Sequence, residues 1–137
     1  MGLLEISRGA AFGDIDNDGD IDILVTNNNG PVRLLLNEVG NKNHWLTIQL
    51  RGTESNTAGL GAKVAVSRTD KPTLWRQAHT DGSYLSAHDS RVSFGLGADA
   101  APVDITVWWP NGRRETWRNI TVDQFIDLQE GSGSHRL

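Results

Sequence analysis

The sequence predicts an all-β protein: an antiparallel β-sandwich or barrel-like domain preceded by a smaller β-hairpin. Apolar residues alternate with polar ones along short segments, whereas helical periodicity is nearly absent. Turn-forming residues separate these segments at short intervals, and the chain contains 15 glycines but only 4 prolines. With 137 residues, the chain has the length of one domain or of one domain with an appended motif.

Residues 1–40 are expected to form a β-hairpin whose first strand follows an acidic loop. Residues 21–26 (IDILVT) have the composition of a strand. Residues 27–31 (NNNGP) predict a turn, because Asn and Gly tolerate positive φ and Pro fixes its own φ. Residues 32–37 (VRLLLN) form the expected return strand, and the polar residues 38–43 are expected to be a linker or a long loop.

Residues 43–130 are expected to form the larger domain, with about seven strands. Alternate apolar residues of each strand face the core, and the residues between them, Ala65 among them, are expected to point outward. The expected strands are residues 45–50, 62–67, 73–80, 91–97, 103–109, 113–118 and 125–130. The expected turns are residues 70–72, 81–82 and 110–112. Residues 131–137 (GSGSHRL) are expected to form a flexible tail.

The charge distribution narrows the classes of function. There are 17 acidic and 13 basic residues, and five of the acidic ones lie within residues 14–22. Because the rest of the chain is nearly balanced in charge, we expect no nucleic-acid partner. No apolar run is long enough for a membrane span, and no secretion leader follows Met1. The absence of Cys excludes disulfides and thiolate metal sites.

The strongest chemical signal is the acidic sequence DIDNDGDID at residues 14–22. Calcium takes about six to eight hard oxygen ligands, several of them carboxylates. Asp occupies loop positions 1, 3, 5 and 9, and Gly19 at position 6 permits a sharp bend. The expected Ca²⁺ ligands are the side chains of Asp14, Asp16, Asp18 and Asp22 and the backbone oxygen of Asp20.

An EF-hand does not fit this loop. An EF-hand needs a bidentate Glu at position 12 and flanking helices, but Val25 stands there and the following segment is a predicted strand. We therefore predict a strand–loop–strand site in which calcium is structural rather than catalytic. The alternative is a solvated acidic turn, which does not account for the regular spacing of Asp and Gly.

Residues 8–37 resemble an FG-GAP (VCBS-type) repeat. The resemblance rests on Ala11-Phe12-Gly13-Asp14, the acidic loop, the strand after it and Asn29-Gly30-Pro31. It implies one blade of a β-propeller, with calcium held by the Asp residues of the loop. A propeller needs several blades, and this sequence has one such loop. The segment is therefore the last piece of a longer propeller chain, or packs on the second domain, or self-associates through exposed strand edges.

Residues 43–130 resemble an ASPIC/UnbV domain. The segments that carry the resemblance are His44-Trp45-Leu46, Gly61-Ala62-Lys63-Val64, Gly82-Ser83-Tyr84-Leu85-Ser86, Phe94-Gly95-Leu96-Gly97 and Trp108-Trp109-Pro110-Asn111-Gly112-Arg113. In this family the domain follows FG-GAP repeats at the C-terminus of cartilage acidic protein-like proteins. The resemblance implies a secreted or cell-surface β-domain and carries no established catalytic residues.

The histidines do not predict a zinc site or a catalytic triad. The four histidines are scattered, with no spacing typical of a zinc site; they are His44, His79, His88 and His135. His79 and Asp81, with Ser83 or Ser86, contain the residue types of a catalytic triad. A triad depends on spatial geometry, however, and residues this close in sequence rarely provide it.

Two adjacent tryptophans suggest a ligand surface. With Val103, Ile105 and Val107 facing the core, Trp109 is expected inward and Trp108 outward. One interpretation of Trp108 is cross-strand packing. The other is a sugar-stacking or protein-binding surface formed with Arg114 and Arg118, next to Arg113. Asn119-Ile120-Thr121 matches a glycosylation sequon.

Together these observations predict a calcium-stabilised extracellular module for adhesion, recognition or self-assembly that is not an enzyme. Its partner is expected to be a protein or a glycan. The alternative is a carbohydrate-binding or accessory module of a secreted enzyme or of a biosynthetic complex.

Overall fold

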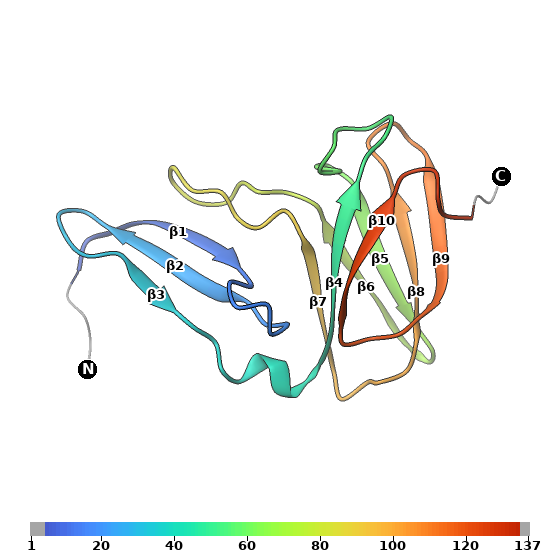
Figure 1. Ribbon diagram of the computed structural model, residues 1–137, viewed down its shortest axis with the longest axis horizontal. Coiled ribbons are helices and arrows are strands. Elements are labelled where there is room, and N and C mark those ends of the chain that lie inside the picture. Colours follow the sequence, from blue (N-terminus) through green and yellow to red (C-terminus); the bar gives the residue numbers. More distant parts are fainter. Residues whose placement is uncertain (1–4, 135–137) are drawn as a thin grey trace.

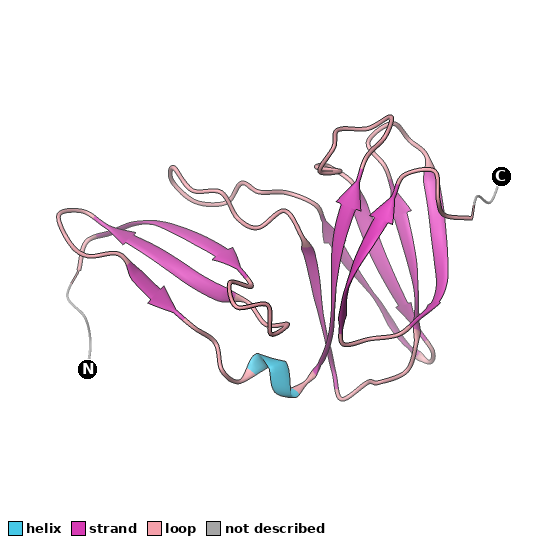
Figure 2. Cartoon of the chain, viewed as in Figure 1, coloured by secondary structure: helices cyan, strands magenta, loops and turns pink. Residues whose placement is uncertain are grey.

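A three-stranded N-terminal sheet and a larger β-domain make up the computed structural model, which describes residues 5–134. In Figure 1 the N-terminal sheet lies at the left and the β-domain at the right, and the short 3-10 helix η1 (Gly40–Lys42) lies between them in the chain. Figure 2 shows that strands form nearly all of the regular structure, which confirms the predicted all-β class.

The N-terminal sheet contains β1 (Ser7–Gly13), β2 (Asp22–Asn27) and β3 (Arg33–Leu35), antiparallel and in that order. The last two strands form the predicted hairpin, although β3 is shorter than expected. The alternation pattern did not identify β1, because four of its seven residues are Gly or Ala, which have low β-propensity. Pairing along β2 nevertheless holds it in the sheet.

Two open sheets that face each other form the β-domain, so its described part is a sandwich rather than a closed barrel. Its strands are β4 (His44–Arg51), β5 (Lys63–Arg68), β6 (Lys71–Gln77), β7 (Val92–Gly97), β8 (Val103–Trp108), β9 (Arg114–Ile120) and β10 (Gln124–Gln129). The strand orders are β10-β4-β7 and β6-β5-β8-β9. Each strand overlaps one of the seven predicted segments.

One strand pair differs from the expected antiparallel arrangement. Strands β4 and β10 run parallel, with Gln124 opposite Leu46 and Gln129 opposite Arg51. The chain crosses from β9 in one sheet to β10 in the other, and such a crossover permits either strand direction. Alternation of apolar residues shows which face of a strand is buried but not the direction in which the strand runs.

The hydrophobic core lies between the two sheets of the β-domain. The alternating residues Leu46, Ile48 and Leu50 of β4 are buried, as predicted, and so are those of the facing strands. The other buried core residues are Ala62, Val64, Val66, Ala78, Val92, Phe94, Leu96, Val103, Ile105, Val107, Trp109 and Leu128. Each large apolar side chain buried here contributes about 1.5–3 kcal/mol of transfer free energy.

Two local details differ from expectation. Ala65 lies on the outward face of β5, as predicted, but it is buried there, next to its direct cross-strand partners Trp75 and Thr106. The turn expected at residues 81–82 lies further along, at Ser83–Ser86. The segment between β6 and β7 reaches away from the sandwich and extends over the N-terminal sheet (Figure 1).

The first residues of the expected flexible tail are held against β9. The backbone N–H groups of Gly131 and Gly133 donate hydrogen bonds to the buried carboxylate of Glu115. Ser134 pairs with Thr116 through two backbone hydrogen bonds of 3.0 Å. The remainder of the expected tail, residues 135–137, lies outside the described residues.

Candidate metal centre

The acidic loop joins β1 to β2 at the end of the N-terminal sheet that is nearest the β-domain (Figure 1). Asn17 and Gly19 have left-handed backbones, with φ values of 59° and 98°. Asn and Gly are the residues that adopt this conformation at least cost, so the sequence allows the chain to curl back on itself within a few residues.

Three carboxylates converge inside this curl. Asp14, Asp16 and Asp18 each offer one carboxylate oxygen, and these oxygens all lie within 4.8 Å of one another. The Asp14 side chain is buried and fixed by the backbone N–H groups of Asp18 (3.1 Å) and Gly19 (2.9 Å). Asp16 is exposed, which leaves one side of the cluster open to solvent.

The other two aspartates of the loop are buried at its end. Asp22 accepts hydrogen bonds from the backbone N–H groups of Ile15 and Asn37, both at 2.9 Å. Asp20 is 5% exposed; its Oδ2 accepts a 3.1 Å bond from the N–H of Asn41, whereas its Oδ1 is buried without a hydrogen-bond partner. Burying an oxygen in this way is costly unless a proton or a cation satisfies it.

The loop carries a strong negative charge. Desolvation and the neighbouring carboxylates of Asp18 and Asp22 raise the pKa of Asp16. Desolvation also raises the pKa of Asp20, an effect only partly offset by the hydrogen bond from Asn41. Within residues 5–134, none of the five loop carboxylates forms an ion pair with Lys, Arg or His. A hard divalent cation fits this set of carboxylate oxygens.

The β-domain grips the same loop through Arg91, which precedes β7. The guanidinium of Arg91 donates a 2.7 Å hydrogen bond to the backbone oxygen of Asp14 and a 2.8 Å bond to the side chain of Asn17. Asp89 fixes the guanidinium from the other side, with an ion pair of 2.6 Å. The loop is thus a contact between the two parts of the molecule as well as a cluster of acids.

Two more residues outside the N-terminal sheet support the loop. Asn41 in η1 donates its backbone N–H to Asp20 and its side-chain amide to Asp18. The indole of Trp45 in β4 lies against Gly19, so closely that a Cβ there would be 1.9 Å from a ring atom. The sequence pattern gave no sign of Arg91, Asn41 or Trp45, because each is brought to the loop by tertiary structure alone.

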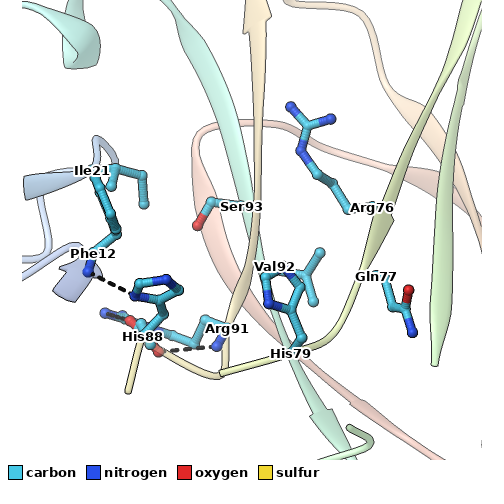
Figure 3. A pocket seen from close by; sticks show the side chains of 10 residues that line it. Phe12, Ile21, Arg76, Gln77, His79, His88, Arg91, Val92 and Ser93 are labelled. Carbon is cyan, nitrogen blue, oxygen red and sulfur yellow. Dashed lines mark hydrogen bonds and ion pairs between the residues drawn. The ribbon is translucent and has the colours of Figure 1, made fainter. Parts of the chain in front are cut away.

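A pocket of about 290 Å³ lies where the N-terminal sheet meets the β-domain (Figure 3). The backbone N–H of Phe12 donates to Nδ1 of His88 at 3.2 Å, and the N–H of Asp89 donates to the Phe12 oxygen at 2.9 Å. The rings of His79 and His88 are arranged edge to face, with centroids 6.4 Å apart and planes inclined at 73°. These hydrogen bonds join the segment before β7 to the outer edge of β1.

The three histidines within the described residues show neither a zinc site nor a catalytic triad. His79 contacts Asp81, but Ser83 accepts a hydrogen bond from the backbone of Ala10 and Ser86 donates to the backbone of Tyr84. His44 pairs with Asp123 at 2.7 Å, and His135 lies outside the described residues. Over residues 5–134, the aspartates at 14, 16 and 18 are the only group of three close metal-binding side chains.

The predicted aromatic surface is partly assembled. Trp109 is buried and Trp108 lies on the outer face of its sheet, as predicted. The guanidinium of Arg114 lies 5.0 Å from the ring centroid of Trp108, whereas Arg118 is four residues further along β9, about 13 Å away at the usual rise of a strand. The guanidinium of Arg113 forms an ion pair with Glu54 at 3.0 Å. Asn119, the asparagine of the glycosylation sequon, is exposed near the end of β9.

The fold and these sites define an all-β module with an acidic loop held between two β-units. The sequence model of the ASPIC and UnbV family matches residues 52–135, more than half of the chain. The chain therefore belongs to the ASPIC and UnbV family.

The sequence is similar to that of cartilage acidic protein 1 from several vertebrates. It is 30% identical to the Xenopus tropicalis protein over 108 residues, covering 77% of this chain and 16% of the relative. It is 28% identical to the human and mouse proteins over 125 residues, covering 89% of this chain and 18% and 19% of those relatives. The chain thus spans less than a fifth of the length of each of these relatives. Its described part has no helix with the length and hydropathy that crossing a membrane requires.

Proposed function

We propose that this protein is a calcium-stabilised binding or scaffold module of an extracellular protein and that it does not catalyse a reaction. The observation that carries the proposal is the convergence of Asp14, Asp16 and Asp18 in a loop whose carboxylates form no ion pair among the described residues. The five aspartates of the loop are the proposed metal residues: Asp14, Asp16, Asp18, Asp20 and Asp22.

The proposed role of the ion is mechanical. Calcium supplies positive charge that offsets the repulsion among the carboxylates. Hydrogen bonds then hold the loop in place: oxygens of Asp14 and Asn17 accept from Arg91, and Asn41 donates to both Asp18 and Asp20. A loop fixed in this shape keeps those contacts aligned, so ion binding would hold the N-terminal sheet against the β-domain.

Two further features support an extracellular module. The relatives are named cartilage acidic proteins, and calcium sites of extracellular modules suit the millimolar calcium found outside cells. The N-terminal sheet, with its loop between β1 and β2, agrees with the FG-GAP resemblance. We therefore propose that this sheet is one blade of a larger propeller in longer relatives.

The scaffold part of the proposal rests on the open edge of β3. This three-residue strand pairs only with β2 within the described residues. Leu34, Leu35 and Leu36 are each about half exposed, and Val32 and Val39 are more so. An edge strand with such neighbours can add a strand from another chain or from a second copy. Self-association through this edge is therefore the proposed mode of assembly.

Unfolding with and without calcium tests the proposal. At a calcium concentration about 100 times the dissociation constant, the free energy of unfolding should rise by about 2.7 kcal/mol over that of chelator-treated protein. Asp16→Asn and Asp18→Ala should weaken or abolish this response. Asp81→Ala, which removes an exposed acid outside the loop, should keep it. Equal unfolding midpoints for metal-free and calcium-treated wild type would contradict the proposal.

A further inference from the structure

The outer face of the β6-β5-β8-β9 sheet carries an aromatic stack. Cross-strand packing of Trp108 was one of the two interpretations of the sequence, but its partner Trp75 was not predicted. The rings of Trp75 on β6 and Trp108 on β8 have centroids 5.1 Å apart and planes inclined at 31°. Both side chains arch over β5, where Ala65, the direct partner of Trp75, is small and buried. Arg114 on β9 extends the row, with its guanidinium 5.0 Å from the Trp108 ring centroid.

This row leaves one indole open. Trp108 has Trp75 on one side and Arg114 on the other, from strands on opposite sides of β8. Trp75 is 53% exposed, which is high for so large an apolar side chain. We therefore assign the contact surface to Trp75, with Trp108 as its support.

A pocket of about 510 Å³ lies beside the stack. Trp75, Trp108 and Trp109 line it together with Gly61, Lys63 and Pro110. Lys63 stands directly opposite Trp108 in the sheet and is exposed. Over residues 5–134, neither Lys63 nor Arg114 forms an ion pair. The face thus combines a flat apolar ring with two positive charges that form no ion pair with any acidic residue in the described part of the chain.

We propose that this face binds an anionic polysaccharide, with a sugar ring on Trp75, its carboxylate or sulfate near Lys63, and an acidic group of another residue of the same polysaccharide near Arg114. The apolar C–H face of a pyranose fits a flat exposed indole, and the acidic groups are complementary in charge to the two cations. The pocket, with a volume of about 510 Å³, has room for one sugar residue. The inference rests on the proposed function, since it names the ligand of the binding module.

Isothermal titration calorimetry with calcium-saturated protein tests this inference. The probes are heparin, which carries sulfates and uronates, hyaluronan, which carries uronates alone, neutral dextran and poly-L-glutamate. We expect one or both acidic polysaccharides to bind, and their relative affinities identify the preferred anionic group. Affinity should fall as NaCl is raised, because screening weakens exposed charge interactions.

Variants localise the binding. Trp75→Ala should weaken binding about tenfold or more, as expected for a central aromatic contact, and Trp75→Phe should weaken it less. Lys63→Gln with Arg114→Gln should weaken binding and flatten its salt dependence. The matched controls, Tyr84→Ala for an exposed aromatic and Arg51→Gln for an exposed cation, should change affinity less than about twofold.

Four results would each overturn the inference. They are no binding of either acidic polysaccharide, unchanged affinity in Trp75→Ala, dextran binding as tightly as the acidic polymers, and Trp75-dependent binding of poly-L-glutamate with equal affinity. Calcium stabilisation is measured on the same samples. If it persists while polysaccharide binding fails, the ligand assignment alone is wrong; if calcium has no effect, the proposed calcium role fails independently.

Discussion

We predict that Glu130→Gln destabilises the protein by about 3 kcal/mol at neutral pH and by progressively less in acid. The Glu130 carboxylate is buried at the end of β10. One of its oxygens accepts the backbone N–H groups of Thr53, Glu54 and Ser55 at 2.8–2.9 Å. The other accepts the hydroxyl of Ser55 at 3.0 Å and the amide of Asn111 at 2.6 Å.

The magnitude follows from proton linkage. Burial by itself would raise the pKa of Glu130, but the hydrogen bonds outweigh it and lower the pKa from 4.5 to about 2. A difference of this size between the unfolded and folded pKa corresponds to about 3 kcal/mol. Because the folded pKa is depressed, this stability is complete above the unfolded pKa of 4.5 and is lost as pH falls towards 2.

Urea unfolding of wild type and Glu130→Gln, both freed of metal, at several pH values between 7 and 2.5 provides the measurement. The difference in unfolding free energy should shrink steadily below pH 4.5. Asp127→Asn, which removes an exposed partner of Arg51, should cost less than about 1 kcal/mol at every pH. A difference for Glu130→Gln that is below 1 kcal/mol at pH 7, or that does not vary with pH, would refute the reasoning.

Two further predictions concern the contact between the loop and the β-domain. Arg91→Met should speed amide hydrogen exchange in β1 and β2 severalfold while leaving the β-domain core protected, whereas Arg51→Met should not; unchanged exchange would show that Arg91 does not hold the loop. Gly19→Ala should lower the free energy of unfolding, measured by urea denaturation, by more than about 1 kcal/mol, because φ is 98° and Trp45 occupies the Cβ position. Gly95→Ala, with nothing within 4 Å of its Cβ position, should lower it less, and equal losses would contradict the observed close approach.

The sandwich could be predicted because its core residues follow a simple period. Leu46, Ile48 and Leu50 alternate with polar residues, and the same pattern marked the strands that face them. Strand β1 escaped prediction because its glycines and alanines are poor strand formers that the neighbouring β2 holds in place. The direction of β10 escaped because a crossover between sheets leaves no trace in alternation.

The acidic residues of the candidate metal centre could be predicted from the sequence, but the residues that hold the loop in place could not. Asp14, Asp16 and Asp18 lie close together because the spacing of acids and glycine dictates a tight curl. Arg91 and Asn41 reach that curl from segments far along the chain, and no local pattern connects them to it. The same reason explains Trp75, which meets Trp108 only because β5 lies between their strands.

The parallel pairing of β4 with β10 limits where the β-domain can be cut out of the chain as a separate fragment. The matching family segment begins at residue 52, immediately after β4, the central strand of its sheet. A fragment cut there would lack the strand that both β7 and β10 need as a partner. During synthesis, likewise, β4 must wait for β10 to emerge from the ribosome before its sheet is complete. Such non-local closure makes for slow folding.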